Sequence, residues 1–194
     1  PALTDLRFYI HGLEVADGEG AWTPLSLDAA SPWQTEDVAL LDLEDGTDAC
    51  RGGSPLVRDI VEGSAATDHI AGLRFTLGVP FDLNHADPVR AESPLNQSVM
   101  HWHWQGGYKF MRAGLADASG VAWVHLGSTE CQGVIRAIES CNHPNRITVE
   151  LDDFDPQKDT VAVHLDVLFA DVTTGENGSS GCMATVSDPT CDAF

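Results

Sequence analysis

The sequence is poor in basic residues, and this scarcity excludes several classes of partner. The 194 residues contain 10 Lys and Arg against 30 Asp and Glu, which gives a formal net charge of −20 at pH 7. A charge of this size repels nucleic acid and anionic membrane surfaces, so we expect no nucleic-acid partner. No apolar run reaches the length of a transmembrane helix, so no membrane span is predicted.

Several catalytic motifs are also missing. There is no Gly-x-Ser-x-Gly elbow, no glycine-rich phosphate loop, and no Cys-x-x-Cys pair of the kind found in zinc ribbons and thioredoxin-like redox sites. The chain starts at Pro1 without a signal peptide, as expected of a mature or trimmed product. We therefore expect a binding protein and not an enzyme.

Five cysteines are present, and their spacing indicates disulfides. Cys131 lies close to Cys141, and Cys182 lies close to Cys191. Two such pairs are typical of an oxidising compartment, so we expect a secreted, cell-surface or periplasmic protein, although the sequence alone does not fix the pairing. Cys50 is left over, and is either free or paired with a cysteine upstream of Pro1.

Short alternating runs separated by Gly, Pro, Asn and Asp predict an all-β fold. Regular spacing of such runs favours a sandwich or a barrel, and one domain over 1–194 is the simplest organisation. Short helices are expected at 54–61 and 96–100. The predicted strands cover residues 6–11, 38–43, 72–79, 98–104, 108–115, 121–126, 146–151 and 161–169.

Strand alternation places several of the eight histidines on outward faces. Side chains two residues apart on a strand share a face, roughly 7 Å apart. Imidazole suits copper, zinc, iron and nickel, so these histidines are candidate metal ligands, although any single one could instead bond to backbone or solvent. The outward sets are Trp123 with His125, His101 with His103, and His164, while Trp102 and Trp104 share the opposite face of their strand.

Two other metal chemistries are open at this point. His101, His103 and His125 could form a three-histidine zinc site of the carbonic anhydrase kind, which would make the protein a hydratase. Acidic loops could bind calcium through oxygen ligands, as in a calcium-dependent surface adhesion or sugar-binding module. The acidic sets are Asp152, Asp153 and Asp155, and Glu44, Asp45 and Asp48.

An ordered set of motifs resembles the MbnP-like family, which includes the copper-repressible surface proteins MopE and CorA of methane-oxidising bacteria. The resemblance covers nearly the whole chain and is most specific between residues 73 and 131. The motifs are Arg7-Phe8-Tyr9-Ile10, Leu73-Arg74-Phe75-Thr76-Leu77-Gly78-Val79-Pro80, Asn84-His85, Met100-His101-Trp102-His103-Trp104, Gly107-Tyr108-Lys109-Phe110, His125-Leu126-Gly127-Ser128 with Cys131, and Gly181-Cys182-Met183.

The resemblance implies a β-sandwich, export from the cell, and copper(I) binding for scavenging or homeostasis. In MopE and CorA, copper is held by two histidines and a tryptophan oxidised to kynurenine, an oxidation attributed to a di-haem peroxidase-like partner. Trp123-Val124-His125 matches the family spacing, and His164 is the best second histidine downstream. His101 and His103 are secondary candidates, either as a second site or as the ligands themselves, with Trp102 or Trp104 as the modified residue.

Overall fold

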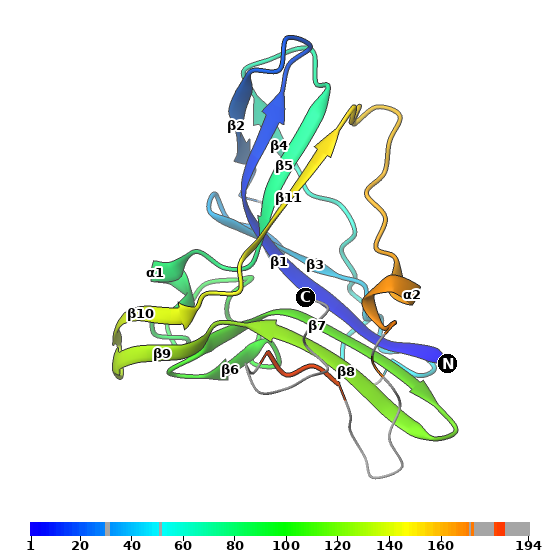
Figure 1. Cartoon of the computed structure of the whole chain (residues 1–194), viewed down its shortest axis with the longest axis vertical. Helices are drawn as coiled ribbons and strands as arrows, with labels where there is room; N and C mark the ends of the chain where they lie inside the picture. Colours follow the sequence, from blue (N-terminus) through cyan, green and yellow to red (C-terminus); the bar gives the residue numbers. More distant parts are fainter. Residues whose placement is uncertain (30–31, 51, 171, 173–180, 185–194) are drawn as a thin grey trace.

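The computed structural model describes residues 1–29, 32–50, 52–170, 172 and 181–184 (Figure 1). Strands dominate it, and both helices in the described ranges are single turns of four residues. No helix in these ranges is long and apolar enough to cross a membrane. The elements are β1 (Ala2–Ala16), β2 (Trp22–Leu27), β3 (Val38–Asp42), β4 (Gly63–Ala65), β5 (Gly72–Leu77), α1 (Phe81–Asn84), β6 (His101–His103), β7 (Gly107–Asp117), β8 (Gly120–Gly127), β9 (Thr129–Val134), β10 (Ala137–His143), β11 (Ile147–Asp152) and α2 (Leu165–Leu168).

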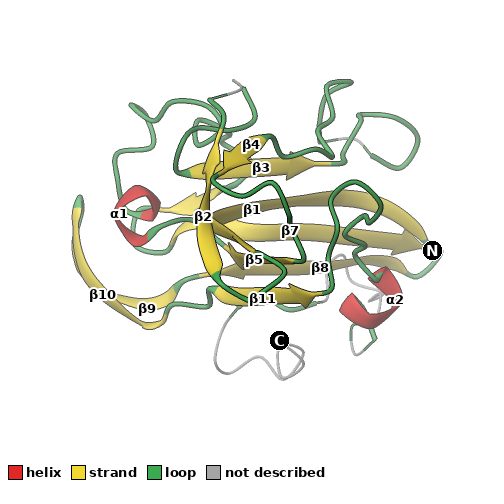
Figure 2. Cartoon of the chain, turned by 90° about the horizontal axis from the view of Figure 1, so that it is seen from above, coloured by secondary structure: helices red, strands yellow, loops and turns green. Residues whose placement is uncertain are grey.

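Strand β1 organises the fold, because it pairs antiparallel with four other strands. Its first half pairs with β7, and β7 pairs with β8 on its other edge. Its second half pairs with β5 and β2, and β5 pairs with β11. The register shifts between His11 and Glu14, where Gly12 has a φ of 58° that favours glycine. The two halves of β1 therefore belong to two groups of strands, which Figures 1 and 2 show from two sides.

Two buried tyrosines of the apolar core fix the chain just before β6. The Tyr9 and Tyr108 rings meet edge to face with centroids 5.9 Å apart. Their buried hydroxyls donate to the backbone oxygens of Pro94 at 3.0 Å and Leu95 at 2.7 Å. A buried hydroxyl without a partner is costly, so both bonds stabilise the position of the 94–95 backbone that leads into β6.

The predicted all-β sandwich class is confirmed, and seven of the eight predicted strands are found. The strand predicted at 161–169 is wrong, because residues 161–164 are irregular and Leu165–Leu168 forms α2. Alternating apolar residues show that a segment can lie against a core, but they do not supply a strand to pair with. Sequence reasoning did not identify β2, β4, β9 and β10 as strands.

Both predicted helices are also wrong. The chain from Ser54 to Val61 is irregular, and the backbones of Asp42 and Arg58 exchange two hydrogen bonds there. These backbone groups are satisfied by the end of β3 and not by a helix. Residues 96–100 form turns, in which the N–H of Met100 donates to the oxygen of Gln97.

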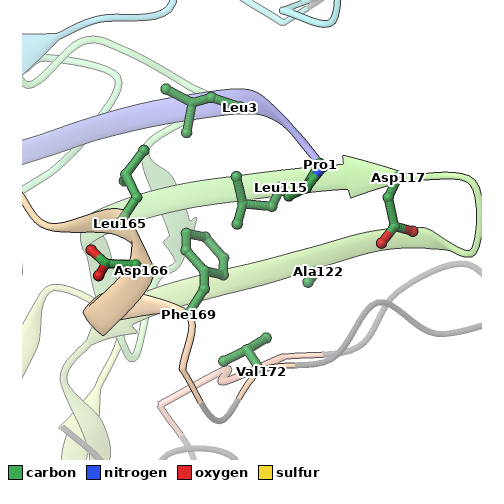
Figure 3. Close-up of a pocket in the computed structure, with 9 residues that line it drawn as sticks. All are labelled: Pro1, Leu3, Leu115, Asp117, Ala122, Leu165, Asp166, Phe169 and Val172. Atoms are coloured by element: carbon green, nitrogen blue, oxygen red, sulfur yellow. The ribbon is translucent and has the colours of Figure 1, made fainter.

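Helix α2 covers one face of the β7–β8 pair. Leu165 and Phe169 line a shallow pocket with Leu3, Leu115 and Ala122 (Figure 3). Leu115 and Ala122 are directly opposed in the β7–β8 register. Because side chains alternate along a strand, the neighbouring residues of β7 and β8 project from the opposite face.

Candidate metal site

The face of β7–β8 away from α2 carries Trp123 and His125. Their ring centroids lie 5.4 Å apart. In the register, Trp123 is opposite Gly114 and His125 is opposite Arg112. Sequence alternation predicted that Trp123 and His125 share a face, and the structure places them so.

Gly114 and Arg112 fix the position of the Trp123 ring. A Cβ at Gly114 would lie 2.6 Å from Cζ3 of Trp123 and 2.5 Å from Oγ1 of Thr4, so only glycine lets the ring lie over β7. The Arg112 guanidinium carbon is 4.8 Å from the Trp123 ring centroid, a cation–π arrangement. Arg112 Nε is also 2.7 Å from a carboxylate oxygen of the buried Asp5.

Trp102 of β6 reaches the same cluster from the other side of β7. Its ring centroid is 6.4 Å from that of His125 and 6.1 Å from that of His103. The indole lies against Gly127, where a Cβ would be 3.2 Å from both Cε3 and Cζ3 of Trp102. For copper, the sequence left His101 and His103 either as a second site or as the ligands in place of the Trp123–His125 pair. In the structure the Trp102 ring connects His103 with His125.

His125 carries a buried ring nitrogen that could bind a metal ion. Its Nε2 is buried and has no hydrogen-bond partner. Burial first, and then the charges of Lys109 and Arg112, lower the pKa of His125 to about 4. Its backbone N–H donates to the oxygen of Cys182 at 2.8 Å, which fixes the strand at this point. The imidazole is therefore neutral near pH 7 and can offer a lone pair.

His101 and His103 are oriented differently. The His101 ring meets Tyr108 edge to face at 5.2 Å, at the rim of the core. His103 is exposed, and its Nδ1 accepts a hydrogen bond of 3.1 Å from the N–H of Gly106. Among the described residues, the ligand atoms of His101, His103 and His125 do not converge within 4.8 Å of one another. A preformed three-histidine zinc site is therefore not present there.

His164 lies at the start of α2 and is exposed. Because α2 packs on the face that carries Leu115 and Ala122, the structure does not place His164 beside Trp123 and His125. Trp104 follows β6 on a turn and is 44% exposed.

The acidic loops do not form a convergent cation site in the described ranges. Asp45 accepts hydrogen bonds from the N–H and the hydroxyl of Thr47, and Asp155 accepts from the N–H of Gln157 and from Lys158. These carboxylates accept hydrogen bonds from residues of the turns in which they lie. No three of the carboxylates considered at 44–48 and 152–155 bring ligand oxygens within 4.8 Å of one another.

One convergent set does occur in the described residues, and it was not anticipated from the sequence. His85, Cys131 and Cys141 bring their ligand atoms within 4.8 Å of one another. Cys131 and Cys141 form the predicted disulfide. The predicted pairing of Cys182 with Cys191 involves a residue outside the described ranges. Cys50 is a free thiol, with its Sγ 3.7 Å from the backbone oxygen of Leu3.

Comparison with known proteins identifies the family. The MbnP family profile matches residues 2–184. The solved structure of MbnP from Methylosinus trichosporium is similar over 98% of this chain and 75% of its own, with a TM-score of 0.82 and 33% sequence identity. No curated protein sequence matches the chain. The resemblance found in the motifs is confirmed, and the chain belongs to the MbnP family.

Proposed function

We propose that this chain is an exported copper(I)-binding protein, not an enzyme, and that His125 is its central ligand. The observation that carries the proposal is the buried, unpartnered Nε2 of His125 between two indole rings. A buried polar atom without a partner costs free energy unless a ligand satisfies it. A neutral imidazole nitrogen suits copper, so the residues present fit the ion.

The family ligand set needs one oxidised tryptophan near a histidine, and two tryptophans flank His125. An indole nitrogen is a poor ligand because its lone pair belongs to the ring, whereas kynurenine exposes an aromatic amine. Either Trp102 or Trp123 would present such an amine beside His125 after oxidation. A di-haem peroxidase-like partner would supply the oxidation, as the family resemblance implies.

The geometry supports Trp102 as the residue converted, with His103 as the second imidazole. Trp102 contacts both histidines, whereas Trp123 contacts His125. The Arg112 cation over Trp123 also opposes removal of an electron from that ring. The set predicted from family spacing, Trp123, His125 and His164, is the alternative.

Metal analysis and peptide mapping of protein from its native host separate these arrangements. We expect stoichiometric copper and a kynurenine mass change on Trp102. The same mass change on Trp123 would restore the spacing-based set. Stoichiometric zinc with unmodified tryptophans would contradict copper binding and favour the hydratase.

A further inference from the structure

A second set of side chains that could hold a metal ion uses none of the residues of the Trp102–His125 cluster. Cys131 of β9 and Cys141 of β10 are directly opposite in the hairpin register. His85 follows α1, and its Nε2 is 3.5 Å from Sγ of Cys141. Figure 1 shows α1 beside the β9–β10 hairpin, which explains how residues from distant parts of the sequence meet.

The His85 ring is held in place with its Nε2 facing Cys141. Phe81 packs against it with ring centroids 4.8 Å apart, and Asn84 Nδ2 lies 3.1 Å from its Nε2. Its Nδ1 is buried and has no hydrogen-bond partner.

Two thiolates and an imidazole form a soft donor set. Cysteine thiolates favour copper(I) and zinc over calcium or magnesium. The sulfurs of the disulfide are no such donors, because they are bonded to each other. With metal–sulfur bonds of about 2.3 Å, two thiolates around one ion stand roughly 3.7 Å apart, which side-chain rotation at directly opposed positions can provide.

We propose that Cys131, Cys141 and His85 bind a soft metal ion once the disulfide between the two cysteines has been reduced. A dithiol supplies the two electrons: its thiolate attacks the sulfur of the half-buried Cys141 and releases the Cys131 thiolate. Its second thiol then displaces Cys141, so the dithiol leaves as a cyclic disulfide and both cysteines end as thiols. Metal binding then releases the two thiol protons.

This site shares no ligand with the proposed copper site. Its ligands lie on β9, β10 and the end of α1, whereas the copper proposal depends on β6 and β8. Loss of copper binding at His125 would leave it untouched, and its own failure would not affect the copper proposal.

Cobalt(II) titration of the full chain tests the site, because thiolate-to-cobalt charge transfer reports sulfur ligation directly. We expect the band after anaerobic reduction with a dithiol and removal of the reductant, and no band in the oxidised chain. Zinc should abolish it by displacing cobalt. Circular dichroism of the reduced chain, recorded alongside, should match that of the oxidised chain.

Variants assign the band to these ligands. The Cys131→Ser/Cys141→Ser double variant keeps the other cysteines and should lose the band, whereas Cys50→Ser should retain it. His85→Gln should weaken cobalt affinity by roughly tenfold or more, since loss of even an indirect partner of a metal ligand costs that much. A reduced wild-type chain without the band, folded or unfolded, overturns the proposal, as does a double variant that keeps it.

Discussion

Trp102 and His125 are in ring contact across β7, with centroids 6.4 Å apart and planes at 79°. Neither strand alone makes this cluster. The β6–β7 turn brings Trp102 over Gly127, and the β7–β8 pairing sets His125 beside Trp123. The candidate site is therefore built by three adjacent strands. Substitutions at residues that support its rings should change its metal affinity even though no ligand is replaced.

A side chain at Gly114 should disturb the site. Gly114→Ala would press on the Trp123 ring and on Thr4, and overpacking of this kind costs about 1–3 kcal/mol of unfolding free energy. Copper affinity should fall as well, because Trp123 packs on His125. Urea unfolding and copper competition measure the two effects. Gly52→Ala is the control, since its Cβ would meet only Arg7 Nη2, at an ordinary 3.7 Å; equal losses in both variants would contradict this reading.

Removing the Arg112 cation should both destabilise the chain and raise the pKa of His125. Arg112→Met leaves the buried Asp5 with Arg7 as its remaining cation, at an expected cost of about 1–3 kcal/mol. The pKa of His125 should rise from about 4, because Arg112 helps to lower it, and NMR titration would detect this. Arg136→Met breaks an exposed ion pair with Asp87 and should cost at most about 1 kcal/mol. An unchanged His125 titration would refute the electrostatic role.

Acid should destabilise the metal-free chain through His125. Between pH 6.5 and about 4 the unfolded chain binds a proton at this histidine while the folded chain does not, so folding stability falls as the pH is lowered through this window. The loss of folding free energy from His125 across this window is at most about 3.4 kcal/mol. His11, His85 and His101 have pKa values lowered in the same direction. Urea unfolding at several pH values should give a shallower decline for His125→Gln than for wild type, and parallel curves would rule the effect out.

Asn84 should be needed to hold the turn that leads into β7. Its buried amide donates to the Gly106 oxygen at 3.1 Å and accepts from the Tyr108 N–H at 2.8 Å. Asn84→Ala should cost about 2–3 kcal/mol, because the buried Tyr108 N–H loses its partner. Hydrogen exchange at that amide should accelerate. Asn84→Asp still offers an acceptor to the Tyr108 N–H, so its exchange rate should stay closer to wild type.

The sequence was sufficient to predict features that depend on neighbouring residues along the chain. Alternation in β8 correctly put Trp123 and His125 on one face, because side-chain direction follows from strand geometry alone. The close spacing of Cys131 and Cys141 likewise indicated their disulfide. The same alternation failed at residues 161–169, since it says nothing about whether a partner strand is available.

Long-range neighbours were beyond sequence reasoning. The contact of Trp102 with His125 depends on the small size of Gly127 and on the β6–β7 register. His85 meets the cysteines only because α1 packs near the β9–β10 hairpin. No periodicity in the sequence predicts that Trp102 contacts His125 or that His85 contacts the cysteines.

The most direct test of the account is copper(I) competition titration of His125→Gln against His143→Gln. Both variants replace one imidazole with an amide, but His143 lies outside the cluster, 3.5 Å from Glu130. With protein purified from its native host, we expect His125→Gln to lose high-affinity copper(I) binding and His143→Gln to bind as wild type does. Full copper affinity in His125→Gln would contradict the central claim that His125 is the ligand on which the site is built.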